Sequence, residues 1–76
     1  MPFKHWDLVE YIPHENAVPK RIGSIGVIKD IDPEGQLNVQ MLFPMWTDQD
    51  KQGEVIGWFT PLVWRRIGHI PKRHRE

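Results

Sequence analysis

Short apolar runs separated by proline and glycine dominate this chain. Seven prolines and six glycines are spread along 76 residues, which leaves little room for a long helix. The runs between them are rich in valine, isoleucine and aromatic residues, and this spacing is typical of a small sandwich or barrel. The pattern therefore predicts an all-β fold.

The clearest alternation of apolar and polar positions lies at residues 37–43. Its period of two predicts a strand whose odd-numbered residues face the core, namely Leu37, Val39, Met41 and Phe43. A second apolar run, 22–31, precedes it, and the intervening segment 32–35 holds the proline and glycine that a tight turn favours. We expect these two strands to form a hairpin.

Three further strands complete the expected fold, at residues 6–12, 54–60 and 65–68. Residues 61–64 between the last two predict a single helical turn, because Thr60 can cap it and Pro61 takes its first position. We expect loops at 14–20 and 44–53. The expected organisation is a five-stranded barrel domain over residues 1–70 and a basic, flexible tail over 71–76.

Charge is balanced overall but is unevenly distributed. Ten lysines and arginines cancel ten acidic residues. Residues 1–61 hold five basic and nine acidic side chains, a net charge of −4, whereas residues 62–76 hold five basic and one acidic, a net charge of +4. This asymmetry indicates a contact with nucleic acid or an acidic protein; the alternative is a solvated tail that keeps the chain soluble.

The absence of cysteine fits a reducing compartment and excludes disulfides and thiol nucleophiles. The N-terminal residues carry no apolar run of the secretory kind, and no stretch reaches the ~20 apolar residues of a membrane span. We expect a cytoplasmic protein that makes no membrane contact.

Residues 23–32 resemble the KOW motif of ribosomal and transcription-elongation proteins, which are small SH3-like barrels. A glycine, β-branched residues and an acidic turn stand in the places of that motif: Gly26, Val27, Ile28, Ile31 and Asp32. Residues 58–67 are similar to the end of such barrels, where an aromatic strand leads into a helical turn and a last strand. The resemblance covers residues 6–67 and implies an SH3-like fold and a nucleic-acid-binding role. The loop 44–53 departs from it, because it is longer and more acidic than in a KOW unit.

Catalytic and metal chemistry find little support in the sequence. Ser24 and Thr60 have no histidine and acid in an order that favours nucleophilic catalysis, and each suits a local backbone hydrogen bond. Type II dihydrofolate reductases are barrels of this size, but residues 56–59 lack the glutamine and tyrosine of that family. The histidines are scattered, and Pro33 interrupts the acidic residues of the turn. We predict no enzyme, no metal and no cofactor.

Tryptophan is the informative residue type, because a thin core cannot bury four of them completely. On the fourth strand, alternation with Val55, Gly57 and Phe59 inward leaves Ile56 and Trp58 outward. On the first strand, Val9 and Tyr11 inward leave Leu8 and Trp6 outward. The alternative for Trp6 and Trp64 is a place at the open ends of the core. The candidate binding residues are Trp46, Trp58 and Trp6, flanked by Arg65 and Arg66.

Two functions follow from these residues. The first is protein docking: an accessory or regulatory subunit that binds a partner through an exposed aromatic face, with homo-oligomerisation through the same face equally compatible. The alternative is a KOW-like module that binds RNA or DNA through its basic C-terminal end, against the repulsion of an acidic body. Only the second function predicts an affinity that falls steeply with salt.

Overall fold

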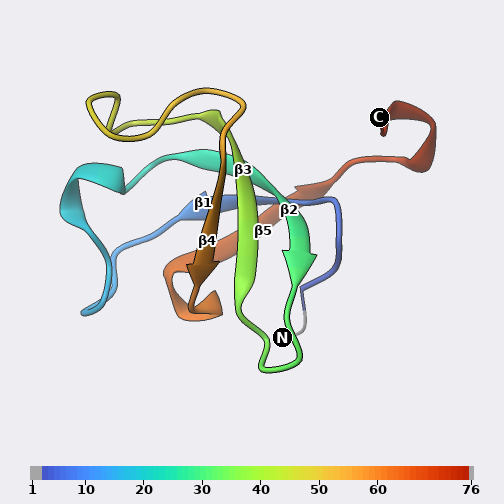
Figure 1. Ribbon diagram of the computed structural model, residues 1–76, viewed down its shortest axis with the longest axis horizontal. Coiled ribbons are helices and arrows are strands. Elements are labelled where there is room, and N and C mark those ends of the chain that lie inside the picture. The colour runs from blue at the N-terminus through green and yellow to red at the C-terminus, as the bar shows by residue number, and fades with distance from the viewer. Residues whose placement is uncertain (1–2, 76) are drawn as a thin grey trace.

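The computed structural model describes residues 3–75 and contains five strands (Figure 1). They are β1 (Asp7–Tyr11), β2 (Ile25–Ile31), β3 (Leu37–Phe43), β4 (Val55–Phe59) and β5 (Trp64–His69). Two single turns of 3-10 helix lie between strands, η1 (Pro19–Arg21) and η2 (Pro61–Val63), and a third, η3 (Lys72–His74), follows β5. The predicted all-β fold, with one helical turn before the last strand, is confirmed. The η1 turn lies where a loop was expected.

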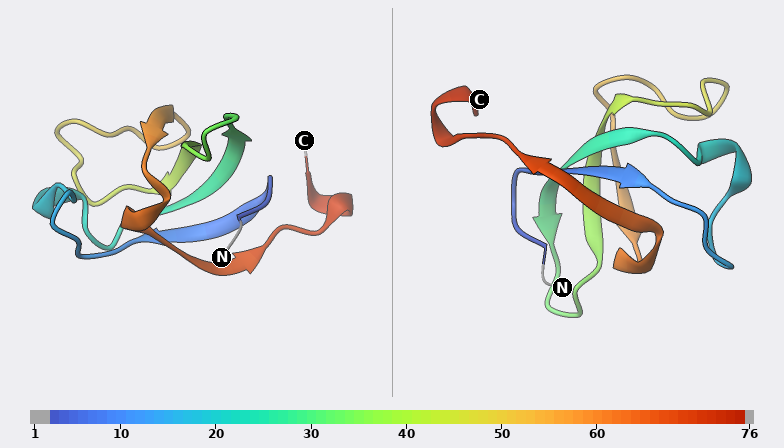
Figure 2. Two further views of the ribbon diagram at one scale, coloured as in Figure 1. Left: turned by 90° about the horizontal axis from the view of Figure 1, so that it is seen from below. Right: turned by 180° about the vertical axis from the view of Figure 1, so that it is seen from behind.

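All five strands belong to one antiparallel sheet in the order β4-β3-β2-β1-β5. The sheet curls over on itself, and η2 carries the chain from one edge strand to the other across the open side (Figure 2). Among residues 3–75 the edge strands β4 and β5 are not hydrogen-bonded to each other, so the curled sheet is not closed.

The core lies inside this curl. Three aromatic rings from different strands meet there edge to face: Tyr11, Phe59 and Trp64, with centroids 5.0–6.0 Å apart. Smaller apolar side chains fill the rest, namely Val9, Ile28, Leu37, Val39, Met41 and Val63. Trp64 is 3% exposed, so it belongs to the core, as the alternative for this residue anticipated.

The β2–β3 hairpin is confirmed. At its turn, Asp32 Oδ1 accepts hydrogen bonds from the backbone N–H groups of Glu34 and Gln36, and Gly35 takes the left-handed conformation with φ 86°. Gly26 allows the two strands to approach closely. A Cβ atom there would clash with Val39 and would lie 2.8 Å from a backbone oxygen of β3.

Strand alternation holds on β1, where Val9 and Tyr11 are buried, but it is wrong on β4. Three residue steps of β4 oppose two of β3, because Phe59 pairs with Leu37 and Ile56 with Val39. This bulge lets Ile56 and Phe59 both pack against the core while Val55 points outward. The outward direction of Trp58 is confirmed.

The end of β3 also departs from its period. Phe43 was expected in the core and is 64% exposed. It is the last residue of the strand, and its β2 partner, Ile25, is the first residue of that strand. The ladder therefore ends at this pair, beyond the part of the curl that covers the core.

Residues 71–75 leave the sheet and contain η3 (Figure 1). Arg75 reaches back to the end of β5, where its Nε donates a hydrogen bond to the Ile70 carbonyl oxygen at 3.2 Å. Glu76, the last residue of the expected tail, lies outside the described residues. The expected flexibility of this segment stays a prediction.

Candidate functional site

The five predicted binding residues lie in three separate places. Trp46 lies in the β3–β4 loop beside η1, and Trp58 lies on the edge strand β4. Trp6 directly precedes β1, whose partner β5 carries Arg65 and Arg66. A single aromatic face is therefore not formed.

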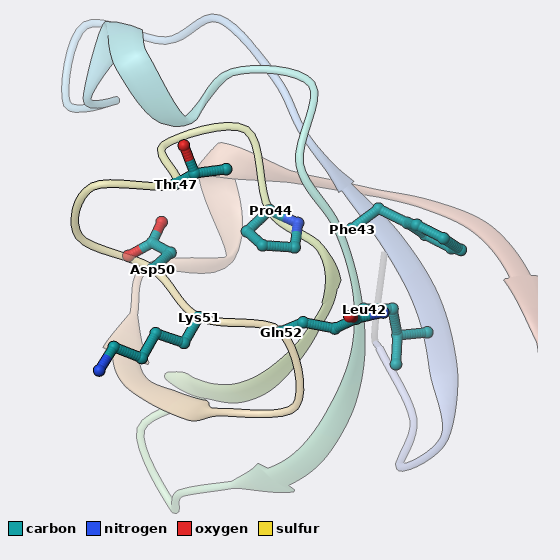
Figure 3. Close-up of a pocket in the computed structure, with 7 residues that line it drawn as sticks. All are labelled: Leu42, Phe43, Pro44, Thr47, Asp50, Lys51 and Gln52. Carbon is teal, nitrogen blue, oxygen red and sulfur yellow. The ribbon is translucent and has the colours of Figure 1, made fainter.

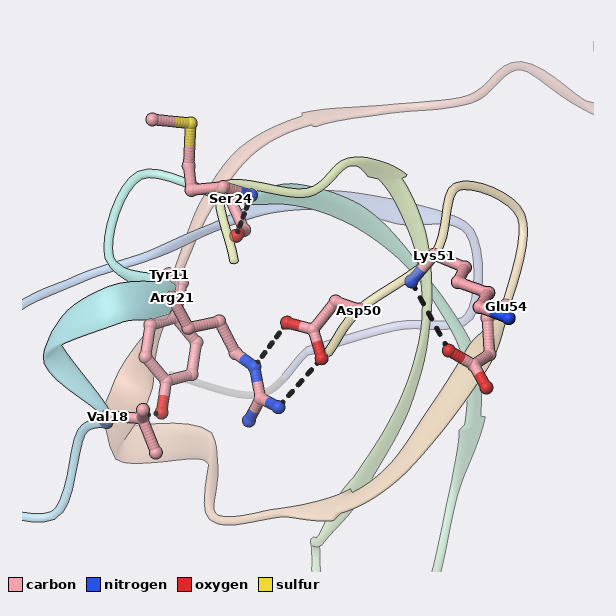
Figure 4. Close-up of polar contacts among 8 residues, drawn as sticks. Tyr11, Val18, Arg21, Ser24, Asp50, Lys51 and Glu54 are labelled. Atoms are coloured by element: carbon pink, nitrogen blue, oxygen red, sulfur yellow. Dashed lines mark hydrogen bonds and ion pairs between the residues drawn. The ribbon is translucent and has the colours of Figure 1, made fainter. Parts of the chain in front are cut away.

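Trp46 belongs to a closed ionic cluster, whose Arg21–Asp50 pair is drawn in Figure 4. Arg21 donates two hydrogen bonds to Asp50, from Nε at 2.7 Å and from Nη2 at 2.9 Å. The Asp50 side chain is 1% exposed and that of Arg21 12%. The same guanidinium lies 5.3 Å from the Trp46 ring centroid and 5.2 Å from that of Phe59. The hydrogen bonds that Arg21 donates to Asp50 raise the pKa of Arg21, so the guanidinium stays charged and holds the loop to η1.

An open cleft of about 480 Å³ lies beside this loop (Figure 3). Its lining residues are Leu42, Phe43, Pro44, Thr47, Asp50, Lys51 and Gln52. Both carboxylate oxygens of Asp50 already accept hydrogen bonds from Arg21. The buried acid of this cleft therefore serves the fold and has little capacity left for a ligand.

Trp58 lies on an edge of the sheet that is apolar and uncharged. Its side chain is 47% exposed and that of Val55 49%. Residues 55–59 include no charged side chain, whereas the opposite edge strand, β5, carries Arg65, Arg66 and His69.

Trp6 lies at the basic end of the molecule, which we define as Lys4, Trp6, Asp7, Lys29, Arg66, His69 and residues 71–75. Lys29 Nζ lies 3.7 Å from the Trp6 ring centroid, and Arg75 Cζ lies 5.7 Å from it. The backbone of Trp6 has φ 73°, a conformation rare for a bulky residue. It is held on both sides, because its N–H donates to the Ile28 carbonyl and its carbonyl accepts from Ile70 N–H.

The buried Asp7 carboxylate neutralises part of the positive charge of the basic end. Its side chain is fully buried and accepts hydrogen bonds from three groups: the Lys4 backbone N–H at 2.9 Å, His69 Nδ1 at 2.8 Å and Arg66 Nε at 3.1 Å. Burial opposes ionisation, but these hydrogen bonds outweigh it and hold the pKa of Asp7 below its ordinary value. Asp7 is therefore an anion that is fully occupied by protein donors.

His69 connects Asp7 to the tail. Its Nε2 lies 2.9 Å from Arg75 Nη2. A guanidinium group can only donate hydrogen bonds, so this contact requires Nε2 to be an unprotonated acceptor. The proton of a neutral ring then lies on Nδ1 and is donated to Asp7. The chain Asp7–His69–Arg75 thus places the guanidinium beside the Trp6 ring.

The basic end keeps a surplus of positive charge. Six of its side chains are cationic: Lys4, Lys29, Arg66, Lys72, Arg73 and Arg75. Against them stand Asp7, whose oxygens are occupied, and Asp30, which lies 3.5 Å from His5. When Asp30, the neighbour of Lys29, is counted with the described residues of this end, six cations and two anions leave +4. Arg65 contributes less, because it is paired with Glu10.

The sequence did not identify Asp7, Lys29 or His69 as site residues. Asp7 and His69 are paired across β1 and β5, 62 positions apart, and no local signal reports such a pairing. Lys29 lies beside Trp6 because the Trp6 backbone is hydrogen-bonded to the neighbouring Ile28, a long-range contact that the hairpin pattern does not predict.

Residues 3–75 contain no group of three or more histidine and acidic side chains placed to hold a metal ion, and no helix there is long and apolar enough to span a membrane. No protein-family model matches the chain, and neither a curated protein nor a solved structure is significantly similar to it.

Proposed function

We propose that this chain binds single-stranded nucleic acid through its basic end. The observation that carries the proposal is the position of the Trp6 ring, which is flanked by Lys29 at 3.7 Å and Arg75 at 5.7 Å. Proteins that bind single strands combine cations that contact phosphates with an aromatic ring on which an unpaired base stacks. The function proposed is that of a non-enzymatic binding module.

Charge supports nucleic acid over a protein partner at this end. The surplus of +4 is concentrated where the acids are occupied, so a phosphate chain meets cations before it meets the acidic body. Trp6 and Trp46, two of the three tryptophans expected on a docking face, have cations against their rings. The strand order and the 3-10 turn before β5 also agree with the SH3-like, KOW-like resemblance, which remains part of the proposal.

Salt dependence tests the proposal directly. Fluorescence anisotropy with labelled oligouridine RNA and oligothymidine DNA of about 12 nucleotides measures the affinity at each salt concentration. If about five phosphates are contacted, affinity falls about 100-fold between about 50 and 200 mM salt. The two oligonucleotides also report any preference for RNA over DNA.

Matched lysine variants locate the site. Lys29→Ala removes a cation of the basic end, and it should weaken binding and lower the salt slope by about one phosphate contact. Lys51→Ala removes an exposed cation of the β3–β4 loop and should change neither. No binding at about 50 mM salt, or equal losses in the two variants, would contradict the proposal.

A second candidate function, protein docking, is supported by the β4 edge. The occupant we propose is a second copy of this chain, with β4 paired antiparallel to β4. Edge strands are usually protected by charged residues, yet residues 55–59 have none, and Val55 and Trp58 are about half exposed. Two β5 edges would bring the arginines of each copy together, so charge favours β4 over β5 for symmetric pairing.

Sedimentation velocity over a range of protein concentrations tests this pairing. A dimer should form with the native chain and should be lost in Trp58→Lys, which places charge on the edge. Ile67→Lys, an equally exposed apolar position on β5, is the matched control and should leave the dimer intact. A monomer at all concentrations would contradict the β4 pairing and would leave nucleic-acid binding unaffected.

A further inference from the structure

Arg75 connects the segment 71–75 of the basic end to His69 and Trp6. Its Nε donates to the Ile70 carbonyl at 3.2 Å, its Nη2 donates to His69 Nε2 at 2.9 Å, and its guanidinium lies beside the Trp6 ring. The ring that would accept a base therefore lies next to a side chain whose position depends on a histidine.

We propose that Arg75 is a proton-controlled latch over Trp6, opened when His69 takes up a proton. This inference rests on the proposed function for its consequence, because an open latch exposes the ring to a base. Histidine is the side chain whose charge ordinarily changes between about pH 5 and pH 8. Once Nε2 carries a proton it can no longer accept from Arg75, and two cations then face each other.

The groups that contact His69 determine which of its hydrogen bonds is lost when the ring takes up a proton. From β1, the Asp7 carboxylate accepts from Nδ1 in both protonation states, so the ring stays anchored. From β5, Arg66 is paired with the same Asp7 oxygen at 3.1 Å, and from the tail Arg75 faces Nε2. The contact that protonation breaks is the one to Arg75, whose other hydrogen-bond partner within residues 3–75 is the Ile70 carbonyl.

The location of Arg75 allows it to move. It lies after η3 and outside the sheet, and the adjoining residues 71–74 are exposed. Arg21 in the closed cluster differs, since both its hydrogen bonds go to a buried carboxylate. Release of Arg75 therefore frees a cation for a phosphate and one side of the Trp6 ring for a base, and affinity should rise with acidity.

Nuclear magnetic resonance follows the latch without any ligand. In ¹H–¹⁵N spectra recorded between about pH 8 and pH 5.5, the Trp6 indole and the Arg75 Nε–H resonances should shift together with titration of His69. Arg75→Ala should abolish the Trp6 shift although His69 still titrates. His69→Gln, which cannot gain a proton, should abolish both shifts. His74→Gln removes a neighbouring histidine and should leave them in place.

Oligothymidine affinity over the same pH range gives the functional readout. The native chain should bind about fivefold more tightly at the acidic end, and His69→Gln should lose this gain, whereas His74→Gln should keep most of it. An equal gain in His69→Gln, or a Trp6 resonance that ignores pH, overturns the latch. A working latch in a chain that binds no oligonucleotide supports the latch and overturns the proposed function.

Discussion

Two clusters in this protein combine a buried aspartate, an arginine and a tryptophan, and they differ in what they leave for a ligand. In the first, Arg21 and Asp50 satisfy each other, and both are shielded from water. In the second, Asp7 is buried but its partners Arg66 and His69 are 51% and 33% exposed. The same residue types therefore close a loop in one place and present positive charge in the other.

An aromatic ring beside a cation is not by itself a binding site. Trp46 and Trp6 both have cations against the ring. Beside Trp46 the arginine is paired with a buried carboxylate, and one exposed lysine, Lys20, lies 5.9 Å from the ring centroid. Beside Trp6, Lys29 lies 3.7 Å from the ring centroid and further cations of the basic end surround it. What distinguishes the two is the surplus of charge and its exposure, because only exposed charge can contact phosphate.

The largest expected effect is on the closed cluster. Asp50→Ala leaves the shielded Arg21 guanidinium without its carboxylate, and breaking such a pair costs about 3–5 kcal/mol. Urea denaturation should show this loss, which is a large share of the stability of a domain of this size. Asp48→Ala, a nearby exposed acid, is the control and should be nearly neutral. A small loss in Asp50→Ala would show that the first cluster is not closed.

The second effect is on the pH dependence of stability and concerns Asp7. Its pKa in the folded chain lies below the ordinary value of 3.8, so its ionised form stabilises the fold above that pH. This contribution is lost as pH falls through the lowered pKa. Asp7→Asn should cost about 2 kcal/mol at neutral pH and should remove the corresponding part of the acid limb, measured by thermal melting. An unchanged acid limb would contradict the assignment of Asp7 as the occupied anion.

The third effect is on affinity. Trp6→Ala removes the proposed stacking surface and should weaken oligonucleotide binding about tenfold, within the usual range for one stacked base. Trp46→Ala is the matched change in the closed cluster and should leave affinity unaltered. Comparable losses in the two variants, measured by anisotropy at one salt concentration, would remove the distinction between the clusters.

The smallest effect concerns the tryptophan outside both clusters. Trp58 is half exposed on an edge strand, so Trp58→Ser should change the free energy of unfolding of the monomer by no more than about 0.5 kcal/mol. It should also leave oligonucleotide affinity unchanged. A larger loss of stability at low protein concentration would mean that the Trp58 indole supports the core. The exposed apolar edge would then be explained by folding and would no longer indicate a docking surface.

Local patterns predicted much of the fold, and long-range pairing explains what they missed. The period of two at Leu37, Val39 and Met41 depends on neighbouring residues only, and it was confirmed. The alternation on β4 failed at a bulge between Ile56 and Phe59, which inserts one residue. The alternation that fits Trp58 and Phe59 therefore puts Val55 and Ile56 on the wrong faces. A bulge depends on the partner strand, so the sequence of β4 alone does not reveal it.

Only part of the candidate site follows from local sequence, because the rest depends on long-range pairing. The residue types tryptophan and arginine indicated Trp6 and Arg66, and both lie at the basic end. Their context came from residues far away in the chain: Asp7 meets His69 across 62 positions, and Arg21 meets Asp50 across 29. These pairings decide which tryptophan faces surplus charge, and they become visible only once the sheet order is known.

The four tryptophans are internal probes of where an oligonucleotide binds. Oligothymidine titrated into ¹⁵N-labelled protein at low salt should shift the indole N–H resonance of Trp6 progressively, together with the side-chain resonances of Lys29 and Arg75. The indole resonances of Trp46, Trp58 and Trp64 should stay in place. A shift confined to Trp46 or Trp58, or four unmoved indoles at saturating oligonucleotide, would contradict the account.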